Sequence, residues 1–463
     1  MGIKKLFAAR DMTQGAPWQR ILEFSIPMLI GNVAQQLYNT ADSVIVGKFV
    51  GDNALAAVGS AMPILNLLLA LFVGIATGAG IVISQSYGAR DREGLSKSIG
   101  NCISLAFIAS LVIMVVGPLL TRPMLELLGT PDSILDWCTA YLKIQFFGIA
   151  GFFFYNMLSG VLRGLGDSVS ALGFLLLAAA LNVVLDLWFV AGFDMGVAGV
   201  SLATVIAQSI SAIFCFRKLM KMRDIFDLNK QTVKLDQFVA MRIIKLGVPS
   251  GITQAIFSMS AIIVQSLTNT LGDAMVAANT AVMRVDGFAM MPNFTFGTAA
   301  TTYIGQNVGA GKAERLKPGV KAMLKLGLIS STVLVTGILL FGHQLIGMFT
   351  ETELTMQLGV QGLQTLAFGY ICFSVSQVLQ GTMRGAGETK VPMYISIITT
   401  VILRMPLAYL LAFLTRNEQW PNGQPAALFV SLLVSWVVAM LLSILSYRMK
   451  FWRKKLGTLG NEL

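Results

Sequence analysis

Five charged residues stand inside long apolar stretches of this 463-residue chain, where an uncompensated charge is costly. They are Asp42, Asp186, Arg284, Asp286 and Arg404. Charges in such surroundings are rare, and they mark ion pathways, proton relays or counter-charges for ligands. A carboxylate in a medium of low dielectric can exchange a proton near physiological pH, so the aspartates are the first candidates for chemistry.

The first two aspartates are expected at the same depth in a membrane. Asp42 lies near the end of an apolar stretch at 21–47, and Asp186 lies near the end of another at 168–191. Both stretches are expected to run outward. At a helical rise of about 1.5 Å per residue, both carboxylates would lie roughly 8–12 Å inside the outer boundary.

Polar side chains accompany both aspartates. Asn182 precedes Asp186 by four residues, which places the two on one helix face. Thr204 stands at a similar depth in the following stretch. Two carboxylates, an amide and a hydroxyl at one level could form an oxygen site for a proton or for Na⁺. The Na⁺ ligands would be Asp42, Asn182 and Asp186. The alternative is two structural acids that bond to backbone or to separate neighbours.

Asp286 allows two interpretations of similar weight. It lies two residues after Arg284, a spacing that does not place the pair on one helix face. Asp286 could therefore face a cavity as a counter-charge for a substrate, or it could bond Arg404 or backbone structurally. Residues that could line a substrate path with it are Gln35, Asn39, Asn156, Phe288 and Met290.

The composition requires a membrane protein. The mean hydropathy is +0.72 and charged residues make up 12%, whereas soluble domains carry about 25%. Apolar stretches long enough to cross a bilayer occur at 21–47, 54–88, 98–120, 137–162, 168–191, 196–220, 243–271, 275–308, 318–342, 356–384, 391–415 and 425–449. The sequence thus predicts an all-α integral membrane protein with twelve transmembrane helices.

The second half of the chain repeats the first at an offset of 221 residues. The pairs are Gly51-Asp52 with Gly272-Asp273, Gln85-x-x-Gly88-Ala89 with Gln306-x-x-Gly309-Ala310, and Arg163-Gly164-x-Gly166-Asp167 with Arg384-Gly385-x-Gly387-Glu388. Six helices per repeat is an even number, so both halves enter from the same side. The predicted architecture is two six-helix bundles related by a pseudo-two-fold axis along the membrane normal. The expected parts are an N-terminal lobe at 1–220, a cytoplasmic linker at 221–242 and a C-terminal lobe at 243–463.

The distribution of positive charge predicts the orientation. With both termini in the cytoplasm, the inner segments carry 28 of the 34 Lys and Arg residues. The net charge of +11 is therefore expected to meet lipid headgroups and not nucleic acid. We therefore expect a multi-pass protein of the cell (inner) membrane, and we expect it to be monomeric.

Several short matches to enzyme motifs do not indicate an enzyme. Gly164-x-Gly166-Asp167 matches part of an intramembrane aspartyl protease signature, but its repeat makes it a tight turn between helices. Gly305–Lys312 has the wrong spacing for a phosphate-binding loop. The four cysteines show no metal-binding spacing, and His343 is the only histidine. No cofactor and no enzymatic activity are expected, and H⁺ or Na⁺ would serve only as the coupling ion.

The polar residues of the first stretch and the paired turns resemble the multidrug and toxic compound extrusion (MATE) family over essentially the whole chain. The motif residues are Pro27, Gln35, Tyr38, Asn39, Asp42 and Gly47, the Asn182-x-x-x-Asp186 pair, and the Arg-Gly-x-Gly turns. The resemblance implies an antiporter that couples inward H⁺ or Na⁺ flow to the export of cationic, often aromatic amphiphiles. It also implies that Asp42, Asn182, Asp186 and Thr204 match the N-lobe cation site of the DNA-damage-inducible-type and archaeal members, with Gln35 and Asn156 lining the nearby chamber.

The C-terminal half departs from one branch of that family. The branch named after norfloxacin export keeps acids on spans seven and ten, whereas 249–271 and 356–384 contain none. This favours coupling in the N-terminal lobe. The alternatives are a lipid-linked oligosaccharide flippase of the same superfamily and, from a different class, an intramembrane enzyme. Flippases line their cavity with several cationic residues, whereas only Arg284 and Arg404 lie within spans here.

Overall fold

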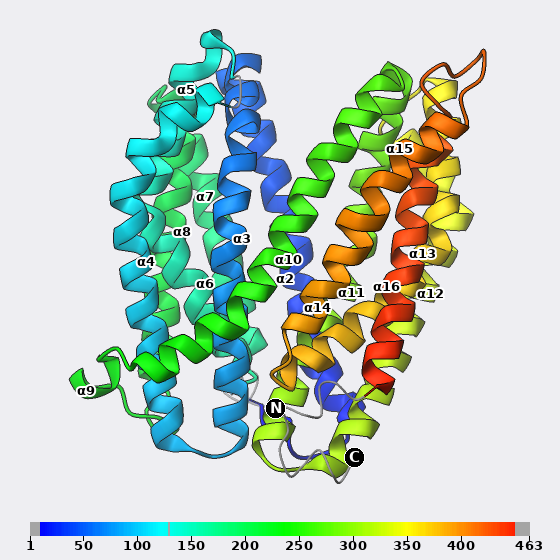
Figure 1. Ribbon diagram of the computed structural model, residues 1–463. Coiled ribbons are helices and arrows are strands. Elements are labelled where there is room, and N and C mark those ends of the chain that lie inside the picture. The colour runs from blue at the N-terminus through cyan, green and yellow to red at the C-terminus, as the bar shows by residue number, and fades with distance from the viewer. Residues whose placement is uncertain (1–9, 128–129, 450–463) are drawn as a thin grey trace. The chain divides into compact units, whose positions relative to one another are not determined.

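The computed structural model describes residues 10–127 and 130–449, and for residues 39, 41–44, 52–53, 55–56 and 63 it describes the backbone alone (Figure 1). All regular elements of this described part are helices. By their internal contacts the described residues form two compact units. The N-terminal unit comprises Met1–Asp11 and Ile26–Gly251, and the C-terminal unit comprises Met12–Ser25 and Ile252–Leu463, each within the described ranges. The predicted lobe boundaries stay predictions.

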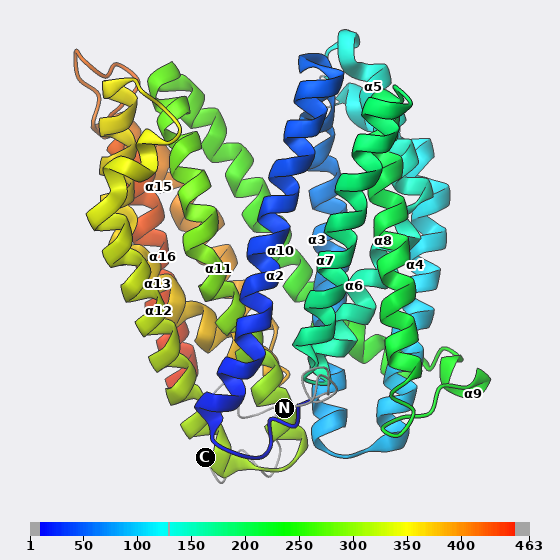
Figure 2. The same cartoon turned by 180° about the vertical axis from the view of Figure 1, so that it is seen from behind.

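Twelve long helical segments make up the two units. In chain order, the first half contains α2 (Pro17–Ile45), η1 (Val46–Val50), α3 (Asp52–Gly88), α4 (Arg92–Leu127), α5 (Asp132–Phe147), α6 (Ile149–Gly164), α7 (Ser168–Asp186), η2 (Leu187–Gly192), α8 (Gly196–Met220) and the short α9 (Lys230–Val233). The second half contains α10 (Gln237–Thr270), α11 (Asp273–Gly309), η3 (Ala313–Arg315), α12 (Leu316–Gly347), α13 (Glu353–Gly385), α14 (Lys390–Ser396), η4 (Ile397–Arg404), α15 (Met405–Leu414) and α16 (Ala426–Arg448). Figure 2 shows the same helices from behind.

The helices agree with the twelve predicted apolar stretches. Within the described residues, nine helices are long and apolar enough to cross a membrane, and a tenth results if α5 and α6, bent by 52° at their junction, count as one span. The remaining two predicted stretches correspond to α2 and α11. The predicted all-α membrane fold is therefore confirmed, while the symmetry axis stays a prediction.

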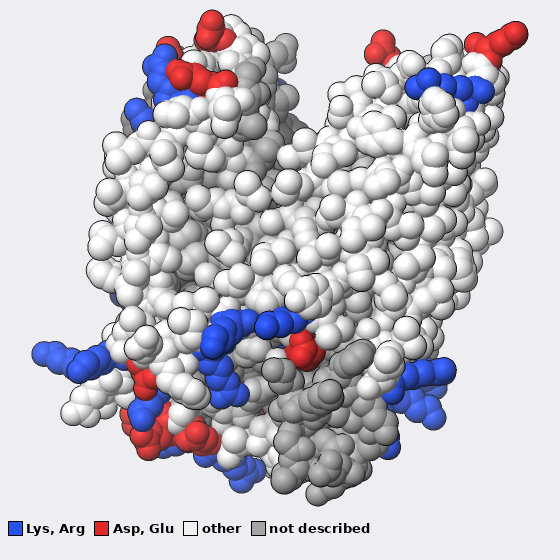
Figure 3. Space-filling view, viewed as in Figure 1, with Lys and Arg blue, Asp and Glu red and all other residues white. Residues whose placement is uncertain are grey.

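The surface of each unit has the pattern of a membrane protein. On the face in Figure 3, charged side chains gather toward the two ends of each unit, and uncharged side chains cover the band between them. Large apolar residues on α4 are strongly exposed, among them Phe107 at 59%, Val115 at 58% and Leu119 at 72%. Contact between so many apolar side chains and water would be unfavourable, so we assign this face to contact with lipid.

The backbone reproduces the sequence repeat. Helices α3 and α11 each begin and end 221 residues apart. The glycines before them, Gly51 and Gly272, have φ angles of 103° and 96°. Gly166 and Gly387, in the turns after α6 and α13, have φ angles of 86° and 91°. Residues with a Cβ rarely adopt these angles, so the repeated glycines are explained by the backbone of the turns.

Glycines also allow one helix crossing to recur in both units. A Cβ added at Gly160 on α6 would lie 2.9 Å from the carbonyl oxygen of Ala76 on α3. The equivalent Gly381 on α13 lies closer to α11, because a Cβ there would stand 2.1 Å from the carbonyl oxygen of Gly297. The same close approach in both units shows that this crossing was retained after duplication.

The segment between the two repeats is bound firmly to α4 within the N-terminal unit. Arg92 donates two hydrogen bonds to the Asp227 carboxylate, both at 2.8 Å, and a third to the Asp224 carbonyl at 2.6 Å. Asn101 accepts a bond from the Asp236 amide at 2.9 Å. The Arg92 guanidinium lowers the pKa of Asp227 through this hydrogen bond. We call residues 221–236 the α4-bound linker.

Candidate functional site

One polar cluster lies inside the N-terminal unit, between α7 and α8. Helix α7 is strongly apolar, and its buried residues toward the C-terminal end are Ala178, Asn182 and Asp186, spaced four apart. This spacing is close to one helical turn, so the three share one face. Asn182 is 1% exposed and Asp186 is fully buried. The apolar helix thus carries two polar groups to an enclosed position.

The Asn182 amide links the members of this cluster. With its nitrogen toward Asp186, it donates to Asp186 Oδ2 at 2.7 Å. Its oxygen then lies 3.1 Å from both the Thr204 hydroxyl and the Thr204 backbone nitrogen on α8. This orientation is assigned from the hydrogen-bonding network, because it satisfies both neighbours. The structure therefore brings together three of the four residues predicted for the cation site.

The remaining predicted residues of this half have different positions. Asp42 and Asn39 lie on α2, and their side chains are outside the described residues. Gln35, also on α2, is exposed. Asn156 on α6 is half-buried, and its amide donates to the Phe152 carbonyl of its own helix at 2.9 Å. The proposed pairing of Asp42 with Asp186 consequently stays a prediction.

The repeat indicates that the fold does not require an acid at the level of Asp186. The corresponding part of the C-terminal half, on α15, carries apolar Leu407 and Ala408. A buried carboxylate is costly in an apolar bundle unless it is compensated. The sister repeat thus has no acid at this level, and the role of Asp186 stays a prediction.

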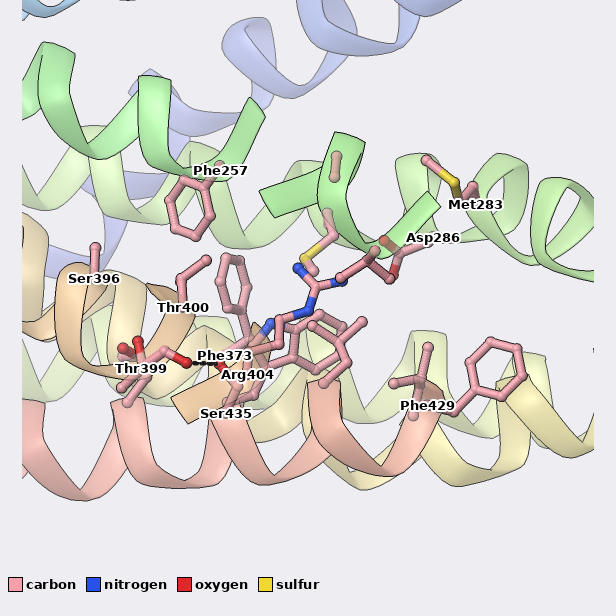
Figure 4. Close-up of a pocket in the computed structure, with 18 of the residues that line it drawn as sticks. Phe257, Met283, Asp286, Phe373, Ser396, Thr399, Thr400, Arg404, Phe429 and Ser435 are labelled. Atoms are coloured by element: carbon pink, nitrogen blue, oxygen red, sulfur yellow. Dashed lines mark hydrogen bonds between the residues drawn. The ribbon is translucent and has the colours of Figure 1, made fainter. Parts of the chain in front are cut away.

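A second polar site is a cavity of about 420 Å³ within the C-terminal unit (Figure 4). Helices α10, α11, α13, α14 and α16 together with η4 supply its walls. Aromatic lining residues are Phe257, Phe294, Phe373, Phe429 and Trp436, and polar ones include Gln265, Asn279, Asp286, Gln377, Gln380, Thr399, Thr400 and Arg404. A volume in this range suits a drug-sized ligand.

Asp286 and Arg404 face one another in this cavity. Figure 4 shows the Arg404 side chain extending from η4 toward Asp286 on α11. Arg404 also donates to the Ser260 hydroxyl at 3.3 Å. The carboxyl of Asp286 has the Tyr370 hydroxyl and Arg404 as its interacting neighbours. Asp286 therefore lines the cavity with Arg404 beside it, and both interpretations of its role stay predictions.

Other predicted residues divide between the cavity and the surface. Met290 lines the cavity. Phe288 is 45% exposed and is not part of the lining, and Arg284 is exposed. Sequence reasoning missed Gln377, Gln380 and the threonines of η4, because single amides and hydroxyls in apolar stretches give no motif. Their position in the cavity depends on packing among helices distant in sequence.

Comparison with known proteins identifies the class. The MatE family model matches residues 27–188 and 249–410, one stretch in each repeat and well over half of the chain together. The chain is 30% identical to "Probable multidrug resistance protein YoeA" of Bacillus subtilis, over 95% of each sequence. It is 23% identical to "Multidrug export protein MepA" of Staphylococcus aureus, over 80% of this chain and 83% of that protein.

Solved structures agree with this result. A structure described as an outward-facing multidrug resistance MATE transporter of the MOP superfamily matches with a TM-score of 0.89 and 25% identity, covering 98% of this chain and 99% of that one. A MOP superfamily transporter from Pyrococcus furiosus matches with a TM-score of 0.87 and 25% identity, covering 97% and 98%. The chain belongs to the MATE family. It is a multi-pass membrane transporter and not an enzyme.

Proposed function

We propose that this protein exports cationic amphiphilic drugs or toxins across the cell membrane in exchange for H⁺ or Na⁺. The names of its relatives, which describe multidrug resistance and export, support the export of small molecules. The buried Asp186–Asn182–Thr204 cluster supports the coupling, and it is the observation on which the proposal depends. Asp42 is the second acid that we assign to this site.

The chemistry follows from the hydrogen bond between Asn182 and Asp186. An ionised Asp186 carboxylate is stabilised by the amide nitrogen at 2.7 Å. When a proton or Na⁺ neutralises the carboxylate, an amide oxygen becomes the better neighbour, because it can accept the proton's hydrogen bond or coordinate the ion. A turn of the amide would then change its bonds with Thr204 on α8. Ion binding would in this way alter the packing of α7 against α8.

Alternating access would use this change to couple the two fluxes. In an antiporter, an ion that binds from outside and is released inside is exchanged for substrate that moves outward. This exchange requires that the cation site hold its ion in only part of the transport cycle. The dense burial of Asp186 restricts ion entry to conformations that open the cluster. Ion binding at the cluster can therefore change the conformation of the protein during the transport cycle.

Dye efflux from vesicles tests the proposal. Purified protein is reconstituted, and export of a permanently cationic fluorescent dye is followed under an imposed pH gradient, an imposed Na⁺ gradient, or neither. We expect one gradient to drive export and Asp186→Asn to abolish this dependence while the dye still binds. The matched control is Asp136→Asn, which removes an exposed acid on α5. Gradient-driven export at the wild-type rate in Asp186→Asn would overturn the coupling role.

A further inference from the structure

A groove of about 590 Å³ lies on the N-terminal unit, between the end of α8 and the α4-bound linker. Its apolar lining comes from Phe216 and Met220 on α8 and from Leu228 and Val233 on the linker. Its polar lining includes two lysines of the linker. We call this site the linker groove. Because its lining comes from both segments, it exists only while the linker is held against the N-terminal unit.

The linker side of the groove has a well-fixed backbone. The Ser104 hydroxyl on α4 donates to the Val233 carbonyl. A Cβ added at Gly100 on α4 would overlap the Thr232 carbonyl oxygen, so α9 approaches α4 at a position that only glycine allows. The Asn229 side chain accepts from the Thr232 amide at 2.9 Å, and the Thr232 hydroxyl accepts from the Asn229 amide at 2.9 Å. These contacts fix the backbone from which the two lysines extend.

The two lysines of the groove bring positive charge without a partner acid. Lys230 is the first residue of α9 and Lys234 follows its last residue, a spacing of four that places the two on one face. Both are exposed, and neither forms an ion pair with another described residue. Two acids of the linker are engaged elsewhere. Asp227 binds Arg92, and Asp236 accepts backbone amides at the start of α10.

The groove lies where the exposed surface changes from apolar to basic. On α8, Ile213, Phe214 and Phe216 are exposed. The helix ends at Met220, and the next exposed residues are basic, beginning with Lys221. Figure 1 shows α9 at the outer edge of the N-terminal unit, and Figure 3 shows positively charged side chains projecting from that edge. A lipid-facing helix that ends in this way places its last turn at the level of the phospholipid headgroups.

We propose that the linker groove binds one anionic phospholipid of the surrounding membrane. Lys230 and Lys234 hold its phosphate. Phe216, Met220 and Val233 contact one of its acyl chains. The proposal goes beyond the export function and does not rest on it, because lipid binding is measured without any transport.

The composition of the groove selects this occupant. A free anion would satisfy the lysines but would leave the apolar lining in contact with water. A zwitterionic phospholipid would fill the apolar part, but its own cation would be repelled by the two ammonium groups. An anionic phospholipid satisfies both parts of the groove. The exposed apolar face of α8 continues from the groove along the helix, so an acyl chain can extend along it.

Competition between two lipids tests the assignment. Purified full-length protein in detergent receives equal amounts of phosphatidylglycerol and phosphatidylcholine with identical acyl chains, and native mass spectrometry measures the affinity for the first bound molecule of each. The wild-type protein is expected to bind phosphatidylglycerol roughly 10- to 30-fold more tightly, as two lysines near a membrane surface predict. This preference should decrease as the salt concentration rises.

Two double variants with the same charge change locate the site. Lys230→Gln with Lys234→Gln is expected to abolish the preference for phosphatidylglycerol. The matched control is Lys317→Gln with Lys321→Gln, since these lysines are also exposed and four residues apart but lie on α12, outside the groove. The control is expected to retain the preference. Equal losses in the two double variants would overturn the proposal, because they would show a general effect of surface charge.

A second pair of variants tests the apolar part. Phe216 is 37% exposed, so Phe216→Ala should fold. It is expected to weaken the binding of both lipids roughly 3- to 10-fold and to leave their ratio unchanged, because the charges remain. The control Ile213→Ala shortens another exposed apolar residue of α8 that does not line the groove, and it should bind both lipids as the wild type does. Equal effects of the two variants would refute the acyl-chain contact.

Three other outcomes would overturn the proposal. Equal affinities of the wild-type protein for the two lipids would reject a charge-selective site. Displacement of phosphatidylglycerol by millimolar inorganic phosphate would mean that the lysines bind an anion without a chain. Loss of the preference in Lys230→Gln with Lys234→Gln, together with faster hydrogen exchange across residues 221–236, would mean that the lysines hold the linker and not a lipid.

Discussion

The bond between Asn182 and Asp186 allows a quantitative test of the coupling site. Replacing Asn182 by alanine removes a 2.7 Å bond to a fully buried carboxylate. A hydrogen bond to a charged group contributes about 1.5–3 kcal/mol, and about 1.4 kcal/mol corresponds to a tenfold change. If this energy supports the transport step, Asn182→Ala should slow gradient-driven dye export by roughly 10- to 100-fold.

A double-mutant cycle gives this prediction its control. Because Asp186→Asn alone is expected to abolish gradient-driven export, the cycle is measured as the melting temperature of the purified protein. If the Asn182 amide acts on the Asp186 carboxylate, the shift of the pair Asn182→Ala with Asp186→Asn should differ from the sum of the two single shifts. Shifts that simply add would show that the two residues act independently, and the proposed link between them would be wrong.

Three further predictions concern packing, the linker and pH. Gly381→Ala must open a contact with Gly297 from 2.1 Å to an ordinary 3.4 Å, whereas Gly160→Ala begins at 2.9 Å. We therefore expect Gly381→Ala to cost about 1–3 kcal/mol and to lower the melting temperature more than Gly160→Ala does; equal shifts would contradict this. Arg92→Ala should release the α4-bound linker, detected as faster amide hydrogen exchange across residues 221–236, and unchanged exchange would contradict the bonding described. The Asp227 pKa is lowered by Arg92, so the contribution of this ion pair is complete above the ordinary Asp pKa of 3.8 and is lost as pH falls through the lowered value. Protection of the linker amides, corrected for their intrinsic exchange rate, should then be independent of pH near neutrality and should fall only in acid, and a loss of protection near pH 6 would refute the assignment.

Much of the fold was predictable because bilayer thickness constrains helix length. Every predicted apolar stretch matches one helix or one bent pair. The bend between α5 and α6 was not predicted, since an apolar run of sufficient length gives no signal for a break at Gly148. The linker was predicted as a polar segment, but its binding to α4 depends on Arg92, which lies far from it in sequence.

The two polar sites differed in how far sequence could define them. Asn182 and Asp186 share a helix face by spacing, and depth alone matched them with Thr204, so their meeting could be predicted. The C-terminal cavity could not, because its walls come from helices brought together only by packing. Phe288 shows the limit: a residue two positions after Asp286 points elsewhere on α11, and periodicity alone does not say which face meets a cavity.

The matching bounds of α3 and α11 have a consequence for the inheritance of this protein. The two helices have the same length but differ in sequence at most positions, so duplication has preserved the length that a bilayer constrains and not the side chains. A charge in one half, such as Asp286 where the other half has Leu65, therefore needs no matching change in its partner repeat. Each half can in this way change its polar residues independently while the helix lengths stay fixed.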